Sequence, residues 1–114
     1  MENFAGLCHC GKVEFKFSLP EKVTRGLRCN CSICKRLGVL HSPIVKPGGV
    51  TVTKGEEELK TYHYDEGEIT WYFCRNCSIY LFYDSEVQGR VNLGCVESVD
   101  TFAIEAAFCD GAKF

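Results

Sequence analysis

Residues Cys8-His9-Cys10-Gly11-Lys12-Val13-Glu14-Phe15-Lys16-Phe17-Ser18-Leu19 join two patterns in one short stretch. Two cysteines one residue apart come first. From position 13 to position 19, apolar residues then alternate with polar ones, which is the period-2 pattern of a half-buried β-strand, and Pro20 ends it. The stretch therefore predicts a strand over residues 13–19 with a cysteine-bearing turn directly in front of it.

The rest of the chain predicts further short strands and almost no helix. The β-type runs are residues 40–45, 50–53, 59–64, 69–73, 79–83 and 90–96. Turn-forming residues lie between them at Pro47-Gly48-Gly49, Asp65-Glu66-Gly67 and Gln88-Gly89. Aromatic residues are dense between positions 62 and 83, which is typical of a sheet core. We expect an all-β meander with one short helix, at Ser32–Leu37.

Length, charge and composition restrict the class of protein. With 114 residues, of which 46% are hydrophobic and 25% charged, the chain fits one globular domain spanning 1–114. The net charge is −2 and Lys35-Arg36 is the only adjacent pair of cations, so we expect no nucleic-acid partner. The first residues lack the pattern of a secretory leader, and no apolar run approaches the roughly 18 residues of a membrane helix. We therefore expect a cytoplasmic protein with no membrane partner.

Seven of the nine cysteines fall into three clusters, Cys8-His9-Cys10, Cys29-Asn30-Cys31-Ser32-Ile33-Cys34 and Cys74-Arg75-Asn76-Cys77. The reducing cytosol disfavours structural disulfides, and an odd number of cysteines cannot all pair within one chain. The spacings C-x-C and C-x-x-C let a tight turn aim two thiolates at one ion. Three such clusters predict zinc binding; the alternative is a thiol-redox protein that uses Cys29, Cys31 and Cys34.

The cluster sizes favour one partition of the ligands. A structural zinc takes four protein ligands, whereas a catalytic zinc keeps three and an exchangeable fourth position. If Cys8 and Cys10 join Cys74 and Cys77, every cluster stays intact and Cys29, Cys31 and Cys34 remain as a three-thiolate site. We thus expect two zinc ions, one structural and one exchangeable or catalytic. Residues that could instead fill the fourth position are His41, His63, Cys95 and Cys109. Both of these cysteines also fit small buried apolar side chains in strands.

The motifs together resemble a known family. The matching residues are Cys8-His9-Cys10-Gly11-Lys12-Val13, Cys29 to Arg36, Phe73-Cys74-Arg75-Asn76-Cys77 with Phe82, Val91 to Cys95, and Phe108-Cys109-Asp110-Gly111. In this order they are similar to the glutathione-dependent formaldehyde-activating enzymes and the related centromere protein V domain. The resemblance runs from about Cys8 to Asp110. It differs where Ser78 and Ile79 follow Cys77, since the family usually has Gly there, and where Val96-Glu97 replaces a leucine-aspartate pair.

The resemblance implies a fold, a cofactor and an activity. It implies an all-β, tent-like (Mss4-like) arrangement of small antiparallel sheets, a structural zinc on Cys8, Cys10, Cys74 and Cys77, and a second zinc on Cys29, Cys31 and Cys34. The implied partners are glutathione and formaldehyde or a similar small aldehyde, in a carbon-sulfur lyase type of reaction. Lys35 and Arg36 are candidates to bind substrate carboxylates, and Tyr62, His63 and Glu97 are candidate acids. The alternative is a non-catalytic interaction module with two structural zinc sites.

Overall fold

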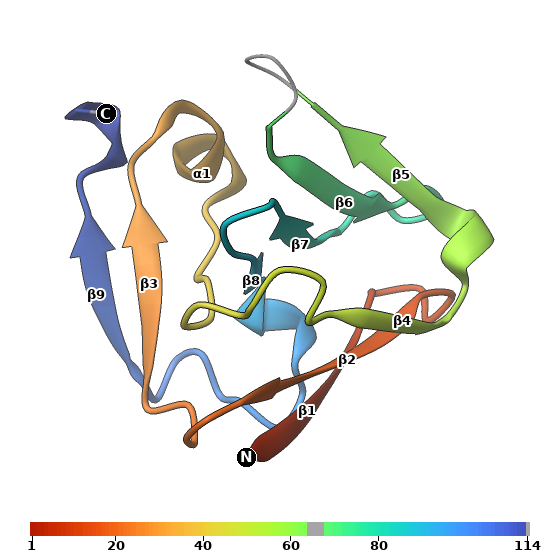
Figure 1. The fold of residues 1–114 in the computed structure, drawn as a ribbon, viewed down its shortest axis with the longest axis horizontal. Coiled ribbons are helices and arrows are strands. Elements are labelled where there is room, and N and C mark those ends of the chain that lie inside the picture. Colours follow the sequence, from red (N-terminus) through yellow and green to blue (C-terminus); the bar gives the residue numbers. More distant parts are fainter. Residues whose placement is uncertain (64–67, 114) are drawn as a thin grey trace.

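The computed structural model describes residues 1–63 and 68–113, and these form three small β-sheets (Figure 1). The first sheet is antiparallel, in the order β1-β2-β4, with β1 at Glu2–Leu7, β2 at Glu14–Leu19 and β4 at Thr51–Lys54. In β2 the alternation expected from the sequence is confirmed, because Phe15, Phe17 and Leu19 are buried while Glu14 and Lys16 are exposed.

The second sheet is an antiparallel meander of four strands that follow one another along the chain. It consists of β5 at Leu59–Tyr62, β6 at Thr70–Cys74, β7 at Tyr80–Asp84 and β8 at Arg90–Val91. Four consecutive residues of β7, from Tyr80 to Tyr83, are buried, because the core lies on both faces of this strand. A 3-10 turn at Glu56–Glu58 leads from β4 into β5.

The third sheet pairs two segments that are far apart in the sequence. β3, at Arg25–Cys29, runs parallel to β9, at Glu105–Cys109, and the register sets Cys29 opposite Cys109. The helix α1, at Ser32–Leu37, follows β3 after a short turn and lies next to it in Figure 1. Its C-cap is Gly38, whose φ of 64° is in the left-handed region, and Lys35 and Arg36 occupy its last turn.

The buried side chains form two clusters. The larger one joins β2 to the second sheet, and its members include Phe15, Phe17, Leu81, Phe82 and Val91. The smaller one consists of Cys34, Val39, Trp71, Tyr80 and Tyr83, so α1 is packed against aromatic residues of β6 and β7. Each cluster crosses from one sheet or helix to another, which ties the small sheets together.

The prediction of an all-β, tent-like fold with at most short helical turns is confirmed, and so is the helix at Ser32–Leu37. Several details differ from expectation. The strands β1 and β3 were not predicted, and the third sheet is parallel rather than antiparallel. Residues 40–45 form only isolated bridges, through His41 and Val45, and the run 90–96 stops as a strand at Val91. A 3-10 turn at Leu93–Cys95 follows, and another lies at Gly111–Lys113.

Two expectations from the sequence fall partly outside what the structure describes. These are the end of the run 59–64, at Tyr64, and the turn Asp65-Glu66-Gly67. Within the described residues, no helix has the length and apolar character needed to cross a membrane.

Candidate metal centres

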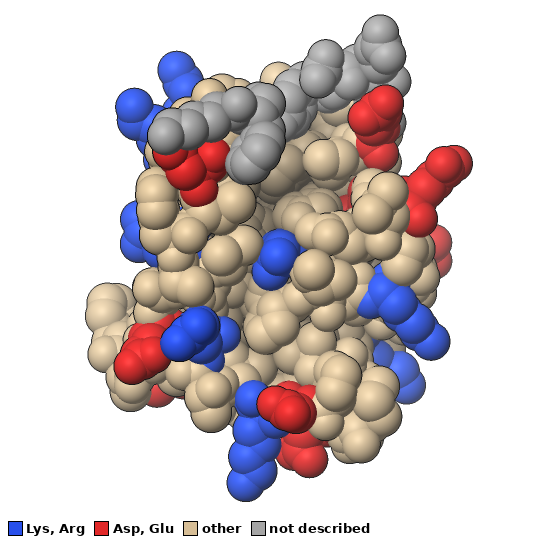
Figure 2. All heavy atoms as spheres, turned by 60° about the vertical axis from the view of Figure 1, so that its left-hand side comes forward, with Lys and Arg blue, Asp and Glu red and all other residues tan. Residues whose placement is uncertain are grey.

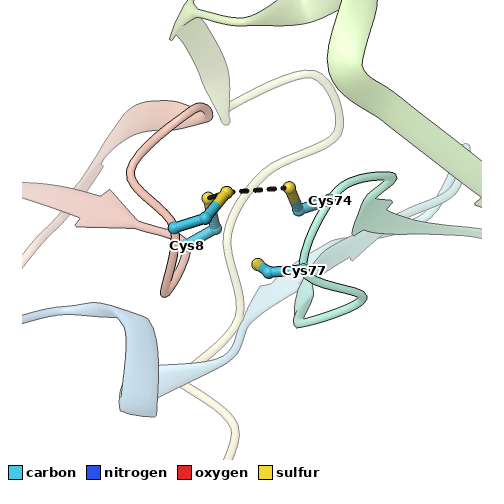
Figure 3. Close-up of side chains that lie close together, drawn as sticks. Cys8, Cys74 and Cys77 are labelled. Atoms are coloured by element: carbon cyan, nitrogen blue, oxygen red, sulfur yellow. Dashed lines mark hydrogen bonds between the residues drawn. The ribbon is translucent and has the colours of Figure 1, made fainter.

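Two turns from different sheets bring the first four cysteines together. Cys8 and Cys10 lie in the turn between β1 and β2, while Cys74 ends β6 and Cys77 lies in the turn toward β7. Figure 3 shows the turn that carries Cys8 facing the turn that carries Cys74 and Cys77. All four sulfurs are within 4.8 Å of one another. The grouping expected from cluster arithmetic is therefore the one that the fold produces.

The spacing of these sulfurs fits a tetrahedral zinc ion. Cys10 Sγ lies 3.6 Å from Cys8 Sγ and 3.7 Å from Cys74 Sγ. With zinc–sulfur bonds of about 2.3 Å, tetrahedral geometry requires sulfurs about 3.8 Å apart. The backbone also suits thiolates, because the Val13 N–H points at Cys8 Sγ at 3.3 Å. This donor set fits the zinc that the sequence predicts.

Two of these thiols, Cys10 and Cys74, differ in acidity in the absence of metal. A hydrogen bond from the Asn76 side chain, with another from the Lys12 backbone, lowers the pKa of Cys10 to about 6. Burial raises the pKa of Cys74 to about 11. Since zinc binds thiolates, loading this site releases a proton from Cys74.

The second group is built by the end of β3 and the start of α1. Cys29 is the last residue of β3, Cys31 is the N-cap of α1, and Cys34 lies inside the helix. The three sulfurs lie within 4.8 Å of one another, and the Cys31 N–H is 3.4 Å from Cys29 Sγ. The α-helical turn is what turns Cys34 back toward Cys31, because residues three apart share one face of a helix.

Burial affects the acidity of this group as well. It raises the pKa of the Cys34 thiol strongly, with Cys31 as a further cause, and it raises the pKa of Cys29. For Cys31, burial acts in the same direction, but hydrogen bonds with the backbone and side chain of Cys34 outweigh it and lower the pKa. Cys34 is thus a thiol that needs a cation, or another partner, to become a thiolate.

The C-terminal turn covers one side of the three cysteines. The Asn30 side chain donates to Asp110 Oδ1 at 2.9 Å and accepts from the Ala112 N–H at 2.9 Å. Gly111 lies so close that an added methyl group would come within 2.6 Å of Cys29 Sγ. Asn30, between two of the cysteines, therefore fastens the end of the described chain over the site.

The other side of this group is formed by buried rings. Cys34 is 6% exposed and shares its cluster with Trp71, Tyr80 and Tyr83. His41 is 1% exposed, and its Nε2 lies 3.5 Å from Cys34 Sγ. Burial, aided by the charge of Arg90, lowers the pKa of His41 to about 4, so the ring is neutral at pH 7.

None of the candidates for a fourth ligand joins the three cysteines, although His41 contacts Cys34 and Cys109 lies opposite Cys29. Neither cysteine group includes His41, His63, Cys95 or Cys109 among the described residues. His63 is exposed. Cys95 is buried as expected, but in a 3-10 turn rather than a strand, where its sulfur faces the Tyr80 carbonyl at 3.5 Å. Cys109 ends β9 as expected but is only half-buried, because that strand lies at the outside of the fold.

The other residues singled out in the sequence are at the surface. Lys35 and Arg36 are both exposed, and Arg36 Nη1 donates to the Ser32 carbonyl at 2.9 Å. Tyr62 is 51% exposed and borders a hollow beside α1. Glu97 is exposed and borders a different hollow, against β1 and β2.

Sequence reasoning missed two parts of the second group, the fastening by Asn30 and the wall of rings around Cys34. Asn30 was a spacer in a cysteine motif, and its partners lie at the far end of the chain. The rings come from β6 and β7, and nothing local in the sequence relates them to Cys34. The closing aromatic-Asp-Gly motif was the one signal that pointed toward the C-terminal turn.

Fold and sites together define a small all-β protein with two cysteine clusters, each able to hold a metal ion. The sequence model of the glutathione-dependent formaldehyde-activating enzymes matches residues 3–110, and the chain belongs to this zinc-binding family. A crystal structure of a protein from Rhodobacter sphaeroides is similar, with a TM-score of 0.79 and 28% sequence identity. The match covers 90% of this chain and 99% of that one. The resemblance seen in the sequence motifs is thereby confirmed.

Proposed function

We propose that this chain, acting as one domain, binds a thiol such as glutathione at a three-cysteine zinc site and promotes its addition to formaldehyde or a similar small aldehyde. One observation carries the proposal. Cys29, Cys31 and Cys34 converge, and no fourth histidine, cysteine or carboxylate of the described chain joins them. A site with three protein ligands has a position for a substrate atom, whereas the four-cysteine group has none.

The residues present suit the metal that the proposal needs. Cys29, Cys31 and Cys34 would hold zinc, and zinc bound there would lower the pKa of a coordinated substrate thiol and keep it as a thiolate. Three thiolates around a divalent ion carry a net negative charge, so a soft sulfur is a better fourth partner than a hard oxygen anion. Cys8, Cys10, Cys74 and Cys77 would hold a structural zinc that fastens the β1–β2 turn to the second sheet.

The reaction is an addition in which no atom is lost. The thiol sulfur forms a bond to the aldehyde carbon, the carbonyl π bond breaks, and the thiol proton ends on the oxygen. The product with formaldehyde and glutathione is S-(hydroxymethyl)glutathione, and the reverse reaction is a carbon-sulfur cleavage. Holding both reactants in one place is the main contribution expected of the protein.

A hollow beside α1 is the candidate place for the remainder of the thiol. It has a volume of about 470 Å³ and is lined by Ser32, Ile33, Arg36, Leu37, Tyr62 and Phe73. Ser32 and Ile33 lie between Cys31 and Cys34 in the sequence, but the three cysteines themselves do not line the hollow. Its floor is apolar, and Arg36 gives it one cation. We assign Arg36 to a carboxylate of the substrate, with Lys35 as a neighbouring charge on the same helix.

The face drawn in Figure 2 has no continuous basic surface of the kind that a polyanion needs. On the face in Figure 2, Lys and Arg side chains are scattered and interspersed with Asp and Glu. The surface in this view is hollowed near its middle, and the cations do not merge into a stripe. A nucleic-acid partner needs such a stripe.

A titration with glutathione tests the proposal. We expect amide NMR signals of residues 29–36 to shift on addition of glutathione to the zinc-loaded protein, and to shift further with formaldehyde. S-methylglutathione, which has no thiol, is the ligand control and should leave the signals of Cys29, Cys31 and Cys34 in place, although its carboxylates can still shift that of Arg36. No shift with any thiol would favour the alternative, an interaction module without turnover.

Two variants test whether the NMR response to glutathione arises at the three-cysteine site. Cys31→Ala should abolish the response, because it removes a ligand of the proposed site. Cys109→Ala is the matched control, since Cys109 is half-buried, lies opposite Cys29 and belongs to neither group. It should respond like the unchanged protein. A lost response in both variants would point to a fourth cysteine ligand and against an open position.

A further inference from the structure

His41 is a buried polar residue that belongs to neither cysteine group. Its Nε2 lies 3.5 Å from Cys34 Sγ, yet none of its nitrogens joins the group that Cys29, Cys31 and Cys34 form. Its other nitrogen, Nδ1, is buried and has no hydrogen-bond partner among the described residues. The contact of Nε2 with Cys34 Sγ is therefore the polar contact from which a role for this buried ring has to be argued.

The backbone holds His41 rigidly in place. Its N–H donates to the Leu27 carbonyl at 2.9 Å, and its own carbonyl accepts from the Leu27 N–H at 2.8 Å. These two backbone hydrogen bonds to β3 fix His41 relative to Cys29, the last residue of the same strand. On the other side, His41 forms a bridge with Asn92. The backbone at position 41 is thus linked to the strand that carries the first cysteine of the group.

The ring itself is held by aromatic neighbours. It meets Tyr80 at 5.6 Å and Tyr83 at 5.4 Å between ring centroids, with interplanar angles of 77° and 76°. Trp71 lies at 6.3 Å. These neighbours pack around the ring, and its Nε2 is directed toward Cys34 Sγ.

The chemistry of His41 Nε2 and Cys34 Sγ determines which of these two atoms donates the hydrogen bond. A thiolate is an acceptor only, so the nitrogen that faces it must carry the hydrogen. A neutral imidazole has a single N–H, and with that hydrogen on Nε2 the Nδ1 atom is a bare acceptor, which agrees with its lack of a donor. The pair is then an N–H···S hydrogen bond to a sulfur of the proposed zinc site.

We propose that His41 is a positioning residue of the three-cysteine site, donating Nε2–H to Cys34 Sγ rather than binding the metal itself. The inference rests on the proposed function, since it assumes zinc on Cys29, Cys31 and Cys34. The hydrogen bond fixes the direction of the Cys34 sulfur and draws negative charge from a site with three thiolates. His41 therefore supports zinc retention and leaves the fourth position to the substrate.

Chelator competition on two variants tests this role. His41→Phe keeps a planar ring but removes the donor, while His41→Gln places a side-chain N–H near the position of Nε2. We expect the phenylalanine variant to hold the second zinc about 10- to 100-fold more weakly, as is typical when a partner of a metal ligand is lost. The glutamine variant should recover most of the affinity. Tyr83→Phe, in the same cluster, is the control and should retain the second zinc normally.

The outcomes separate this role from simple packing and from failure of the function. Equal affinity in all variants, or equal weakening by phenylalanine and glutamine, would overturn the role of the donor. If the unchanged protein binds no second zinc, the proposed function fails first, and the inference with it. A measurement on the unchanged zinc-loaded protein avoids any folding defect of the variants. Long-range ¹H–¹⁵N spectra should show the Nε2–H tautomer, and an Nδ1–H tautomer would contradict the proposal.

Discussion

At the scale of single residues, Ser78 has a backbone conformation that glycine adopts more easily. Its φ is 64°, and it is the only non-glycine residue of the described chain with a positive φ. The Ser78 N–H donates to the Cys74 carbonyl at 2.8 Å, so this conformation closes the turn that carries Cys74 and Cys77. The sequence differs here from its family, which usually has Gly, but the turn keeps the shape that glycine favours.

Replacing Ser78 with glycine should therefore stabilise the protein. The left-handed region costs a residue with a side chain about 1–2 kcal/mol, and glycine avoids this cost. Glycine also loses more conformational entropy on folding, which offsets part of the stabilisation. We expect Ser78→Gly to raise the free energy of unfolding by about 0.5–1 kcal/mol in urea titrations at fixed zinc. Ser98→Gly, at an exposed serine without positive φ, should lower it instead. A loss of stability in both variants would refute this explanation.

The cysteine spacing was informative at this scale because metal ligands must be close to one another. Spacings of one and two residues place two sulfurs on one turn whatever the rest of the chain does. The grouping into four and three could thus be predicted from Cys8 to Cys77 alone. The partners of Asn30 and His41 could not, because their contacts are made by segments that are distant in the sequence or irregular.

At the scale of elements, the link from β4 to β5 depends on Gly55. Its φ is 79°, and a methyl group at this position would overlap the carbonyl oxygen of Lys12. Lys12 belongs to the turn that follows Cys10, so Gly55 lets the chain pass directly against the first cysteine turn. This contact is one of those that place the β1–β2 turn opposite the second sheet.

Gly55→Ala should be strongly destabilising. The left-handed conformation alone costs about 1–2 kcal/mol, and the overlap with a backbone atom cannot be relieved by rotation of a side chain. We expect the free energy of unfolding to fall by more than about 2 kcal/mol. Gly48→Ala is the matched control, with a φ of 69° and open space around its Cα, and should cost only the conformational part. Equal effects would show that the contact with Lys12 is unimportant.

Strands that bury large side chains gave the clearest sequence patterns, whereas several exposed or irregular strands gave weak ones. β2 and β7 bury large side chains and gave clear patterns. In β1 and β9 most residues are exposed or half-buried, so apolar alternation is weak. β3 contains Gly26 and two arginines, and its partner follows it by 80 residues. Residues 40–45 are apolar enough for a strand, but their hydrogen bonds go to separate partners, which breaks the ladder.

At the scale of the whole molecule, we expect the two proposed zinc sites to have different structural roles. The four-cysteine group joins the first sheet to the second, while the three-cysteine group lies within one segment, from the end of β3 into α1. Loss of zinc from the four-cysteine group should release the first sheet from the second. Loss of zinc from the three-cysteine group should change only the local segment and its fourth position.

Removal of Cys74 tests this division. A structural zinc site contributes folding free energy on the order of 10 kcal/mol, which is comparable to the whole stability of a small domain. We expect Cys74→Ala to lose one zinc and to be unfolded by circular dichroism. Cys95→Ala is the matched control, because Cys95 is also buried but lies in neither group. It should stay folded, keep both zinc ions and lose only about 1–2 kcal/mol.

The variant Cys31→Ala completes the comparison. It should remain folded and lack only the second zinc, which mass spectrometry under native conditions would measure. If Cys31→Ala and Cys74→Ala unfold alike, both sites are structural and the fourth position has no role for a substrate.

Zinc absorption spectroscopy, with and without glutathione, tests the central claim most directly. With one four-sulfur site and one three-sulfur site, the average should be about 3.5 sulfurs per zinc, rising to about 4 when the thiol binds. S-methylglutathione should leave the average unchanged. An average of about 4 sulfurs before glutathione is added, or no change when it is, would contradict an open thiol-binding zinc site on Cys29, Cys31 and Cys34.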